Sequence, residues 1–369
     1  MATKGIKENV KNILKQFNFT GELVSCNPYG NGHINDTFLI EFNCDGSDEK
    51  YILQRINTNI FKNPEQVMSN IIGVTSYLRG ILTEMGEDAE RRAVRVIMTN
   101  DGNGFYSDES GCWRVLAFID GCVSLDLPET DEDFYQVGVA FGEFQSMLDK
   151  YPAETLFETI PNFHNTPARY ETFLKSLDKN ASGRAEKVSA EIEFVKARAE
   201  FMKVLEDSHE AGVLPKRVTH NDTKMNNVML DKITRKPVCV VDLDTIMPGY
   251  SVTDFGDAIR VGASTAVEDE KDLSKVHFDL HQFEIYTKGF LEACGKNLTE
   301  AELDLLPAGA KMMTLECGMR FLTDYIDGDT YFKTAYPEHN LVRCRTQFRL
   351  VEEMESMWDE MKSVVEKYK

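Results

Sequence analysis

One short polar segment carries residue types that could transfer a phosphoryl group. Residues 219–227 read THNDTKMNN and contain the pattern H-x-D-x-x-x-x-N, with His220, Asp222 and Asn227 at its fixed positions. Transfer to an alcohol needs a carboxylate that orients the attacking hydroxyl and accepts its proton. It also needs hard oxygen ligands that hold Mg²⁺ against a triphosphate. Asp222 is therefore the predicted base, and Asn227 is a predicted metal ligand.

The second metal ligand follows from a hairpin predicted after this motif. Residues 228–230 and 237–241 are apolar runs on either side of a turn-rich stretch at 231–236. A two-strand hairpin returns the chain beside its start, so Asp242 is expected next to Asn227. An ordinary polar loop between two buried strands is the alternative interpretation, and the coincidence of the motif with the hairpin counts against it.

A literal match to the metal motif of protein kinases lies further along the chain. Residues 254–256 are Asp-Phe-Gly, but they lie beyond the turn signal MPG at 247–249 and do not end the returning strand. We therefore assign the metal to Asp242. Asp254 is expected either to cap a helix at 257–262 or to accept hydrogen bonds from the catalytic loop.

A glycine-containing segment near the N-terminus is a candidate cover for a nucleotide. Residues 28–37 read PYGNGHINDT and join two predicted strands. Gly30 and Gly32 would let backbone N–H groups approach phosphate oxygens closely. His33, at the tip, is suited to hydrogen-bond a substrate hydroxyl or a phosphate. Because the pattern is not G-x-G-x-x-G, a plain hairpin turn is the alternative.

The lysine that normally grips the nucleotide phosphates is missing. In the strand-like run YILQRI at 51–56, Gln54 stands where that lysine is expected, and Arg55 follows it. The next helical segment has a glutamate, Glu65, only in its first turn. Either Arg55 substitutes, or other groups and the metal hold the nucleotide. A nucleotide-binding protein without turnover is the further alternative that this absence leaves open.

The elements that must position these groups divide the chain into two parts. Strand-like runs lie at 21–27, 37–43, 50–56, 93–99 and 112–119. Between them a helix at 64–82 follows Asn63, a good N-cap, with Pro64 at its first position. Helical patterns then dominate, at 131–148, 166–177, 186–208, 275–293, 299–322 and 342–368, around a β-rich stretch at 217–245.

This order predicts an α+β, protein-kinase-like fold of two lobes. A small antiparallel sheet lobe at 1–119 would bind the nucleotide. A mainly helical lobe at 120–369 would hold the catalytic loop, with the boundary near residues 120–128. A chain of 369 residues is long enough for two such lobes.

Composition narrows the class of partner. The formal net charge of −20 disfavours nucleic acid, and no basic patch offsets it. No run approaches 18 apolar residues, so no membrane span is expected. The first seventeen residues read as an amphipathic helix without the apolar core of a signal peptide. The 8 cysteines are scattered without a C-x-x-C pair, which favours a reducing cytoplasm.

A last polar feature lies in the C-terminal part. Arg320 and Asp324 are four residues apart in a predicted helix, and the polar-aromatic stretch DGDTYF at 327–332 follows, with Tyr331 in it. The simplest interpretation is a surface salt bridge followed by a helix-ending turn, with Tyr331 as a packing residue.

Several segments resemble the N-acetylhexosamine 1-kinases, of the aminoglycoside phosphotransferase and choline kinase superfamily. The resemblance is carried by THNDTKMNNVML, VVDLDTIMPG, TDFGDAIRVGASTAVEDE, ECGMRFLTDY and TAYPEHNLVR, and by YGNGHINDTFLI and YILQRINTNIF near the start. It therefore runs over nearly the whole chain. The H-x-D-x-x-x-x-N core is common to the superfamily, whereas GHIN, GMRF and YPEHNL resemble the narrower subgroup.

The resemblance implies transfer of the ATP γ-phosphoryl group, with Mg²⁺, to the anomeric hydroxyl of N-acetylglucosamine or N-acetylgalactosamine. It implies Asp222 as base, and Asn227 and Asp242 as metal ligands. The adenine would lie against Phe118, Ile119 and Asp120. The sugar would contact His33, Asp222, Arg320 and Tyr331. The subgroup itself resembles this chain in lacking the usual lysine.

Another small alcohol is the competing acceptor. Choline would call for an aromatic cage around its quaternary ammonium, and an aminoglycoside would call for a dense acidic pocket. A neutral sugar instead needs hydrogen-bonding side chains such as His, Arg, Asp and Tyr.

Overall fold

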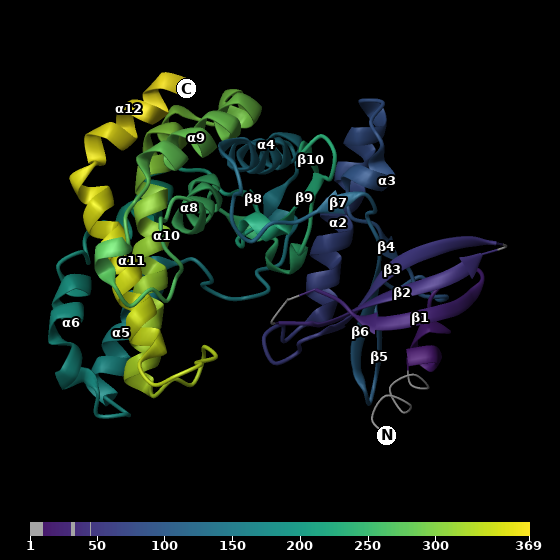
Figure 1. Ribbon diagram of the computed structural model, residues 1–369, viewed down its shortest axis with the longest axis horizontal. Coiled ribbons are helices and arrows are strands. Elements are labelled where there is room, and N and C mark those ends of the chain that lie inside the picture. The colour runs from purple at the N-terminus through teal and green to yellow at the C-terminus, as the bar shows by residue number, and fades with distance from the viewer. Residues whose placement is uncertain (1–9, 31–33, 45) are drawn as a thin grey trace.

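Six strands of the N-terminal part form one antiparallel sheet (Figure 1). They are β1 (Glu22–Pro28), β2 (Asp36–Cys44), β3 (Ser47–Ile56), β4 (Val96–Ile97), β5 (Tyr106–Asp108) and β6 (Gly111–Ala117). Their order is β1-β2-β3-β6-β4, with β5 also paired to β6. The computed structural model describes residues 10–30, 34–44 and 46–369. Ile40 of β2 and Leu53 of β3 are fully buried, as expected where one face of a sheet covers a core.

Helix α2 (Pro64–Glu84) links this sheet to the rest of the molecule. Asn63 caps it by accepting a hydrogen bond from the Gln66 backbone N–H at 3.2 Å, which confirms the predicted start. The buried face of α2 shares one hydrophobic cluster with Cys112 of the sheet and with Leu243, which directly follows Asp242. The short helix α3 (Ala89–Arg92) comes next.

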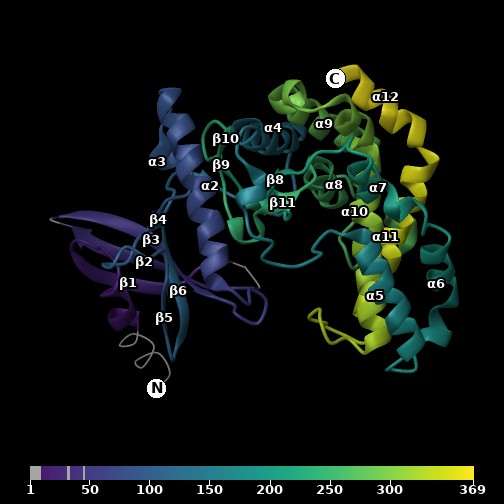
Figure 2. The same ribbon diagram turned by 180° about the vertical axis from the view of Figure 1, so that it is seen from behind.

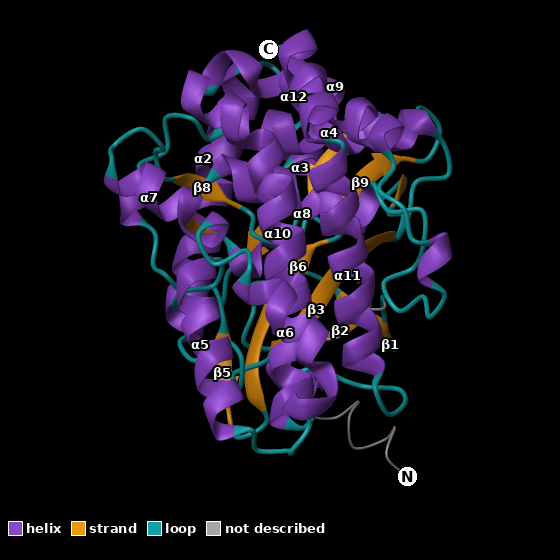
Figure 3. Ribbon diagram, turned by 90° about the vertical axis from the view of Figure 1, so that its left-hand side faces the viewer, coloured by secondary structure: helices purple, strands orange, loops and turns teal. Residues whose placement is uncertain are grey.

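The C-terminal lobe is mainly helical (Figures 2 and 3). Its helices are α4 (Asp131–Met147), α5 (Thr166–Lys179), α6 (Ser189–Lys196), α7 (Val204–Glu210), α8 (Ser251–Gly262), α9 (Leu280–Cys294), α10 (Glu300–Asp327), α11 (His339–Ser356) and α12 (Trp358–Tyr368). Its short strands are β7 (Cys122–Val123), β8 (Arg217–Thr219), β9 (Val228–Asp231), β10 (Pro237–Val240) and β11 (Met247–Gly249), which form the antiparallel sheets β10-β9-β7 and β11-β8. The predicted two-lobe α+β fold is confirmed, while the boundary at residue 119 stays a prediction.

Glycines bring the central helices of this lobe into close contact. A Cβ atom added at Gly256 of α8 would lie 2.2 Å from the Gly309 carbonyl oxygen of α10. One added at Gly138 of α4 would lie 2.5 Å from the Tyr286 carbonyl oxygen of α9. Only glycine leaves room for backbones this close. The glycine of the Asp-Phe-Gly segment therefore serves helix packing.

Several predicted element bounds were wrong, each for a local reason. The predicted helix at 186–208 is broken by 3₁₀ turns into α6 and α7. The predicted helix at 342–368 is interrupted at Met357 between α11 and α12. Helix α9 begins only at Leu280, because Asp279 caps it by accepting from the backbone N–H groups of His281 and Gln282. The predicted strand at 93–99 shortens to β4, and β5 was not predicted.

The N-terminal end of the chain agrees with the prediction in the part that the structure describes. Residues 10–14 of the predicted N-terminal helix are helical. Among the described residues, no helix combines the length and the apolar character that crossing a bilayer requires.

Candidate active site

The predicted base lies in the loop between β8 and β9. Asp222 is partly buried, with its side chain 24% exposed. The side-chain amide nitrogen of Asn227 donates to the Asp222 carbonyl oxygen at 2.7 Å and to its Oδ2 at 3.2 Å. Because the nitrogen is used in this way, Asn227 Oδ1 faces elsewhere, and among the described residues none donates to it. Asn227 therefore orients the predicted base, Asp222, and its amide oxygen accepts no hydrogen bond among the described residues.

The predicted hairpin is confirmed and brings Asp242 to this loop. Val240 of β10 pairs with Val228 of β9, and the Val241 backbone N–H donates to the Asn227 carbonyl oxygen at 2.9 Å. Asp242 follows directly, in the left-handed region with φ +59°. Such strained backbone is held in place by its surroundings and is common at functional sites.

Asp242 as a whole is exposed to solvent. Its carboxylate group, however, is surrounded by protein atoms and has lost much of its water. This loss of water, together with repulsion from Asp244 and Asp222, raises the pKa of Asp242 to about 6. Asp222 and Asp242 are neighbouring carboxylates whose repulsion a bound cation would relieve, whereas Asp244 is already paired with Arg114. The described residues hold no cluster of three or more His, Cys, Asp or Glu side chains in metal-binding arrangement. Mg²⁺ fits the pair of Asn227 Oδ1 and Asp242, since it takes few protein oxygens and completes its shell with water and phosphate.

His220 connects the predicted base, Asp222, to the residue after β10. It is fully buried, against the edges of the Phe141 and Phe144 rings. Its Nδ1 accepts from the Asp222 backbone N–H at 3.3 Å, and its Nε2 therefore donates to the Val241 carbonyl oxygen at 2.9 Å. The histidine of the motif is thus a positioning residue with no free ring nitrogen.

Asp254 holds the same loop from beneath. Its carboxylate is 1% exposed and accepts from the backbone N–H groups of His220 and Asn221, each at 2.8 Å, and from Gln145 Nε2 at 2.9 Å. Of the two expectations for Asp254, the hydrogen bonds to the loop are confirmed. The capping role was wrong, because α8 already begins at Ser251 and contains Asp254 in its first turn.

A lysine inside the motif was overlooked in the sequence. Lys224 Nζ lies 3.1 Å from Asp222 Oδ2. Burial alone would lower the pKa of Lys224, but the charge and hydrogen bond of Asp222 outweigh it and raise that pKa. Lys224 is therefore a cation that the loop itself places beside Asp222.

The predicted nucleotide-binding residues lie on two segments that meet. Gly30 has φ +75°, a conformation that glycine adopts without strain, whereas Gly32 and His33 lie outside the described residues. The Tyr29 ring packs edge-on against the Phe118 ring, with centroids 5.9 Å apart. Phe118, buried Ile119 and exposed Asp120 connect β6 to β7, between the lobes.

Gln54, which stands in place of the expected lysine, belongs to a polar chain within the N-terminal lobe. Its Nε2 donates to Thr37 Oγ1 at 3.1 Å, and its Oε1 accepts from Arg114 Nε at 2.9 Å. Arg55 is paired with Asp36 at the surface, and Glu65 is exposed. Arg55 therefore does not take the place of the missing lysine in this structure.

Of the four residues predicted to bind a sugar, Arg320 lies near the end of α10 and Tyr331 in the loop after it, Asp222 lies in the loop between β8 and β9, and His33 lies outside the described residues. The Arg320 guanidinium carbon lies 5.8 Å from the ring centres of Phe163 and Tyr331 and 5.6 Å from that of Phe332. Among the described residues, no carboxylate or carbonyl accepts a hydrogen bond from it. Tyr331 is 66% exposed. In Figure 1 this loop extends from α10 toward the N-terminal lobe.

The interpretation of Arg320 and Asp324 as a surface salt bridge was wrong. Asp324 is buried and accepts from the backbone N–H groups of Thr330, Tyr331 and Phe332 at 2.7–2.9 Å, and from Asn340 Nδ2 at 2.8 Å. A carboxylate surrounded by donors in this way fixes the backbone of the loop.

His164 connects the two halves of the site, which the sequence did not suggest. Its Nε2 lies 3.1 Å from the Asn221 carbonyl oxygen of the catalytic loop, and its Nδ1 lies 3.0 Å from Glu316 Oε1 on α10. Burial alone would lower the pKa of His164, but the hydrogen bond and charge of Glu316 outweigh it and raise that pKa. Because both ring nitrogens face acceptors, the imidazolium form satisfies both contacts. Glu316 lies one helical turn before Arg320.

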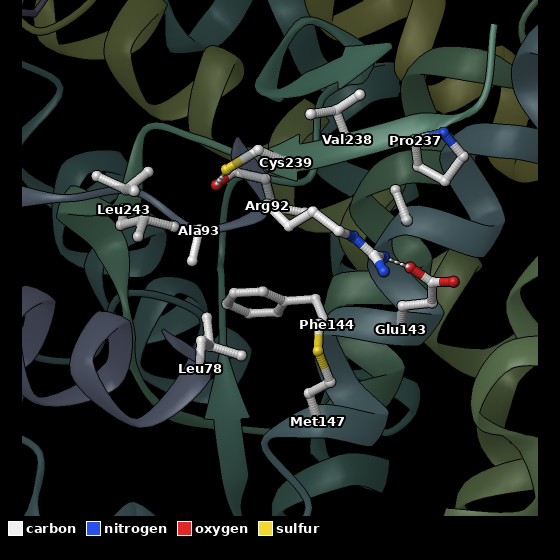
Figure 4. Close-up of a pocket in the computed structure, with 13 residues that line it drawn as sticks. Leu78, Arg92, Ala93, Glu143, Phe144, Met147, Pro237, Val238, Cys239 and Leu243 are labelled. Carbon is white, nitrogen blue, oxygen red and sulfur yellow. Dashed lines mark hydrogen bonds and ion pairs between the residues drawn. The ribbon is translucent and has the colours of Figure 1, made fainter. Parts of the chain in front are cut away.

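A small cavity elsewhere between the lobes is not part of this site. It measures about 20 Å³ and lies between α2, α4 and β10 (Figure 4). Phe144 points into it, and an ion pair of Arg92 with Glu143, at 2.6 Å, lies at one side. Its volume suits about one water molecule.

Comparisons with known proteins agree with this architecture. The structure is similar to an aminoglycoside phosphotransferase from Alicyclobacillus acidocaldarius, at 12% identity and a TM-score of 0.62, over 97% of this chain and 96% of that one. It is similar to a choline kinase from Cryptosporidium parvum, at 12% identity and a TM-score of 0.59, over 98% and 99%. It is also similar to a spectinomycin phosphotransferase solved with ADP and spectinomycin, at 12% identity and a TM-score of 0.53, over 98% of each chain.

At this identity the structures show a shared fold, that of the protein-kinase-like phosphotransferases. The sequence adds the family itself. The model of the phosphotransferase enzyme family, APH, matches residues 25–272, which is more than half of the chain and includes both the glycine-containing segment and the catalytic loop. The chain therefore belongs to the phosphotransferase enzyme family.

Proposed function

We propose that this phosphotransferase moves the γ-phosphoryl group of ATP to the anomeric hydroxyl of an N-acetylhexosamine. The observation that carries the choice of acceptor is Arg320, a guanidinium without a hydrogen-bonding partner among the described residues and surrounded by three aromatic rings. Aromatic faces and a fork of N–H donors suit a sugar, which offers C–H faces and oxygen acceptors.

The charges around Arg320 disfavour the cationic acceptors. Burial lowers the pKa of Arg169, and the charge of nearby Arg320 lowers it further. The Glu316 carboxylate acts on both guanidinium groups and offsets one of the two charges, so the remaining positive charge would repel the ammonium groups of choline or an aminoglycoside. A neutral acceptor with an acetamido carbonyl gains from the same two charges. The aromatic rings alone would suit choline, and the two arginines favour a neutral acceptor instead.

Each remaining residue has a role in this scheme. Asp222 would accept the proton of the attacking hydroxyl, and Asn227 orients the Asp222 carboxylate. Asn227 Oδ1 and Asp242 would hold Mg²⁺, which neutralises charge on the transferring group. The adenine would lie at Phe118, Ile119 and Asp120, and the segment with Gly30, Gly32 and His33 would cover the phosphates and reach the sugar. The spectinomycin phosphotransferase was solved with ADP, which supports an adenine nucleotide as the ligand.

Product analysis by NMR tests the proposal. The protein is incubated with ATP and Mg²⁺ and with N-acetylglucosamine, N-acetylgalactosamine, choline or an aminoglycoside in separate reactions. We expect ³¹P and ¹H signals of a sugar 1-phosphate, with Asp222→Asn as the inactive control. Phosphocholine or a phosphorylated aminoglycoside, with no sugar phosphate, would overturn the choice of acceptor and leave the phosphotransferase assignment intact.

A further inference from the structure

Asp242 is followed by a short stretch that the N-terminal lobe holds from several sides. Asp244 is bound by Arg114 of β6 and by Asn35, which precedes β2. Two residues later, the Ile246 carbonyl oxygen accepts from Asn70 Nδ2 of α2 at 2.9 Å. Three separate parts of the N-terminal lobe therefore converge on residues 244–246.

The central contact is a buried ion pair of Arg114 with Asp244. Arg114 is 2% exposed and Asp244 is 4% exposed. Arg114 Nη1 binds Asp244 Oδ1, and Nη2 donates to Oδ2 at 3.0 Å, in the parallel geometry that suits a guanidinium and a carboxylate. Asn35 Nδ2 adds a third hydrogen bond, to Oδ2, at 2.6 Å.

This geometry excludes two other roles. Arg114 is 2% exposed, and its guanidinium donates from Nε to Gln54 Oε1, from Nη1 to Asp244 and Met68 Sδ, and from Nη2 to Asp244, so it is not placed to bind a phosphate. Both oxygens of Asp244 already accept hydrogen bonds, from buried Arg114 and partly buried Asn35, and Asp244 is 4% exposed, so it has little to offer a metal. The group therefore acts on its neighbours and not on a ligand.

The neighbours are the two parts of the site that must meet across the nucleotide. Asp242 lies two residues before Asp244, in its left-handed backbone conformation. Asn35 ends the glycine-containing segment, and its Oδ1 accepts from the Asn57 backbone N–H at 2.9 Å. Asp244 thus joins the metal side of the site to the segment that covers the phosphates.

We propose that Arg114, Asp244 and Asn35, here termed the Asp244 cluster, are positioning residues that set Asp242 relative to the nucleotide-covering segment. The cluster links the two lobes. Gln54 stands where the phosphate-gripping lysine is expected in this chain, and it is hydrogen-bonded to Arg114 of the same cluster. The inference rests on the proposed role of Asp242 in holding Mg²⁺, but it does not depend on which acceptor is used.

Three variants test the cluster through nucleotide and metal binding. Asp244→Asn removes the charge, Arg114→Gln removes the bidentate partner, and Arg114→Lys restores the charge without the fork. Titration calorimetry of Mg·ATP binding, and Mg²⁺ activation of turnover, are measured for each. Residues that orient a metal ligand typically contribute about 10- to 100-fold in metal affinity or activity. We expect losses of that order for Asp244→Asn and Arg114→Gln, partial recovery in Arg114→Lys, and an acceptor KM within about twofold.

Asn35→Ala covers the case in which the buried variants do not fold. Asn35 is only partly buried, so this variant should keep its Tm within a few degrees and still raise the Mg²⁺ concentration for half-maximal activity by several-fold. The matched control is Arg91→Gln. Arg91 of α3 pairs with Asp231 of β9 at 2.6 Å, another ion pair between elements far apart in sequence, but one outside the Asp244 cluster. The Mg²⁺ requirement of this control should not change.

Two results would overturn the proposal. If Asp244→Asn alone raised the Mg²⁺ requirement while Arg114→Gln and Asn35→Ala left it unchanged, Asp244 would itself be a metal ligand. If the cluster variants lowered only Tm, the group would be purely structural. Failure of the sugar assignment would instead leave Mg·ATP binding responsive to the cluster, so the two failures can be told apart.

Discussion

Asp242 and Asp254 lie near the same loop, and their removal should have opposite consequences. Asp254 is buried and binds three donors, the backbone N–H groups of His220 and Asn221 and the amide of Gln145. Asp242 is exposed and faces the like charges of Asp244 and Asp222. Asp254→Ala should therefore chiefly lower stability, whereas Asp242→Ala should abolish Mg²⁺-dependent activity in a folded protein.

The size of the effect at Asp254 follows from its partners. Each buried donor left without an acceptor costs about 1–3 kcal/mol. For the three donors of Asp254 the total is about 3 kcal/mol or more, a large fraction of the roughly 5–15 kcal/mol that stabilises a typical domain. The expected fall in Tm is roughly 5 °C or more. Asp242→Ala removes a repelled carboxylate, so its Tm should stay the same or rise.

The assay pairs thermal melts with Mg²⁺ titrations of turnover for both variants. Asp254→Asn, which keeps one acceptor oxygen, should fall between the wild type and Asp254→Ala in Tm. Below its melting temperature, Asp254→Ala should retain a Mg²⁺ requirement close to that of the wild type. A steep rise in that requirement for Asp254→Ala, together with normal Mg²⁺ dependence for Asp242→Ala, would refute the assignment of the metal to Asp242.

Three further predictions concern single side chains. Asp222→Asn should leave the fold and ATP binding intact and cut kcat by about 10²–10⁴-fold, and near-normal turnover by the purified variant would contradict its role as base. Arg320→Leu should raise the acceptor KM by about ten- to a hundred-fold, with the ATP KM within a few-fold; a raised ATP KM alone would mean that Arg320 binds phosphate. Because the pKa of His164 is raised in the folded state, its stabilisation is complete below an unfolded pKa of about 6.5 and is lost as pH rises through the folded value. The Tm difference between wild type and His164→Gln should therefore shrink as pH rises above about 6.5, and a constant difference would argue against the imidazolium.

The hairpin of the active site was predictable because its contacts are local. The turn at 231–236 and the apolar runs beside it fix which residues pair, and Asp242 then follows the end of β10 next to Asn227. The same reasoning assigned the metal to Asp242, which follows the hairpin, and not to Asp254 of the Asp-Phe-Gly segment. It did not give the start of α8, since the residues at 251–256 are largely buried and carry no polar cap.

The contacts that hold the site in place were not predictable in this way. Asp244 meets Arg114, and His164 meets Glu316, across more than a hundred residues in each case. Nothing in the spacing of such residues indicates a pair, because the fold alone brings them together. The lysine was expected on β3, at the position of Gln54. The sequence could not indicate that a buried arginine, Arg114 on the neighbouring strand β6, links the lobes through Asp244.

The end of α10 shows why a correct spacing rule led to a wrong contact. Residues at i and i+4 do share a face of a helix, and for Arg320 and Asp324 that rule suggested an ion pair. In the folded chain Asp324 instead accepts from three consecutive backbone N–H groups and from Asn340, because the loop after α10 turns back over it. Since its neighbour is used in this way, the Arg320 guanidinium stays available beside the Tyr331 ring. The carboxylate that was expected to pair with Arg320 thus shapes the loop of the proposed sugar site, and this follows only once the path of the loop is known.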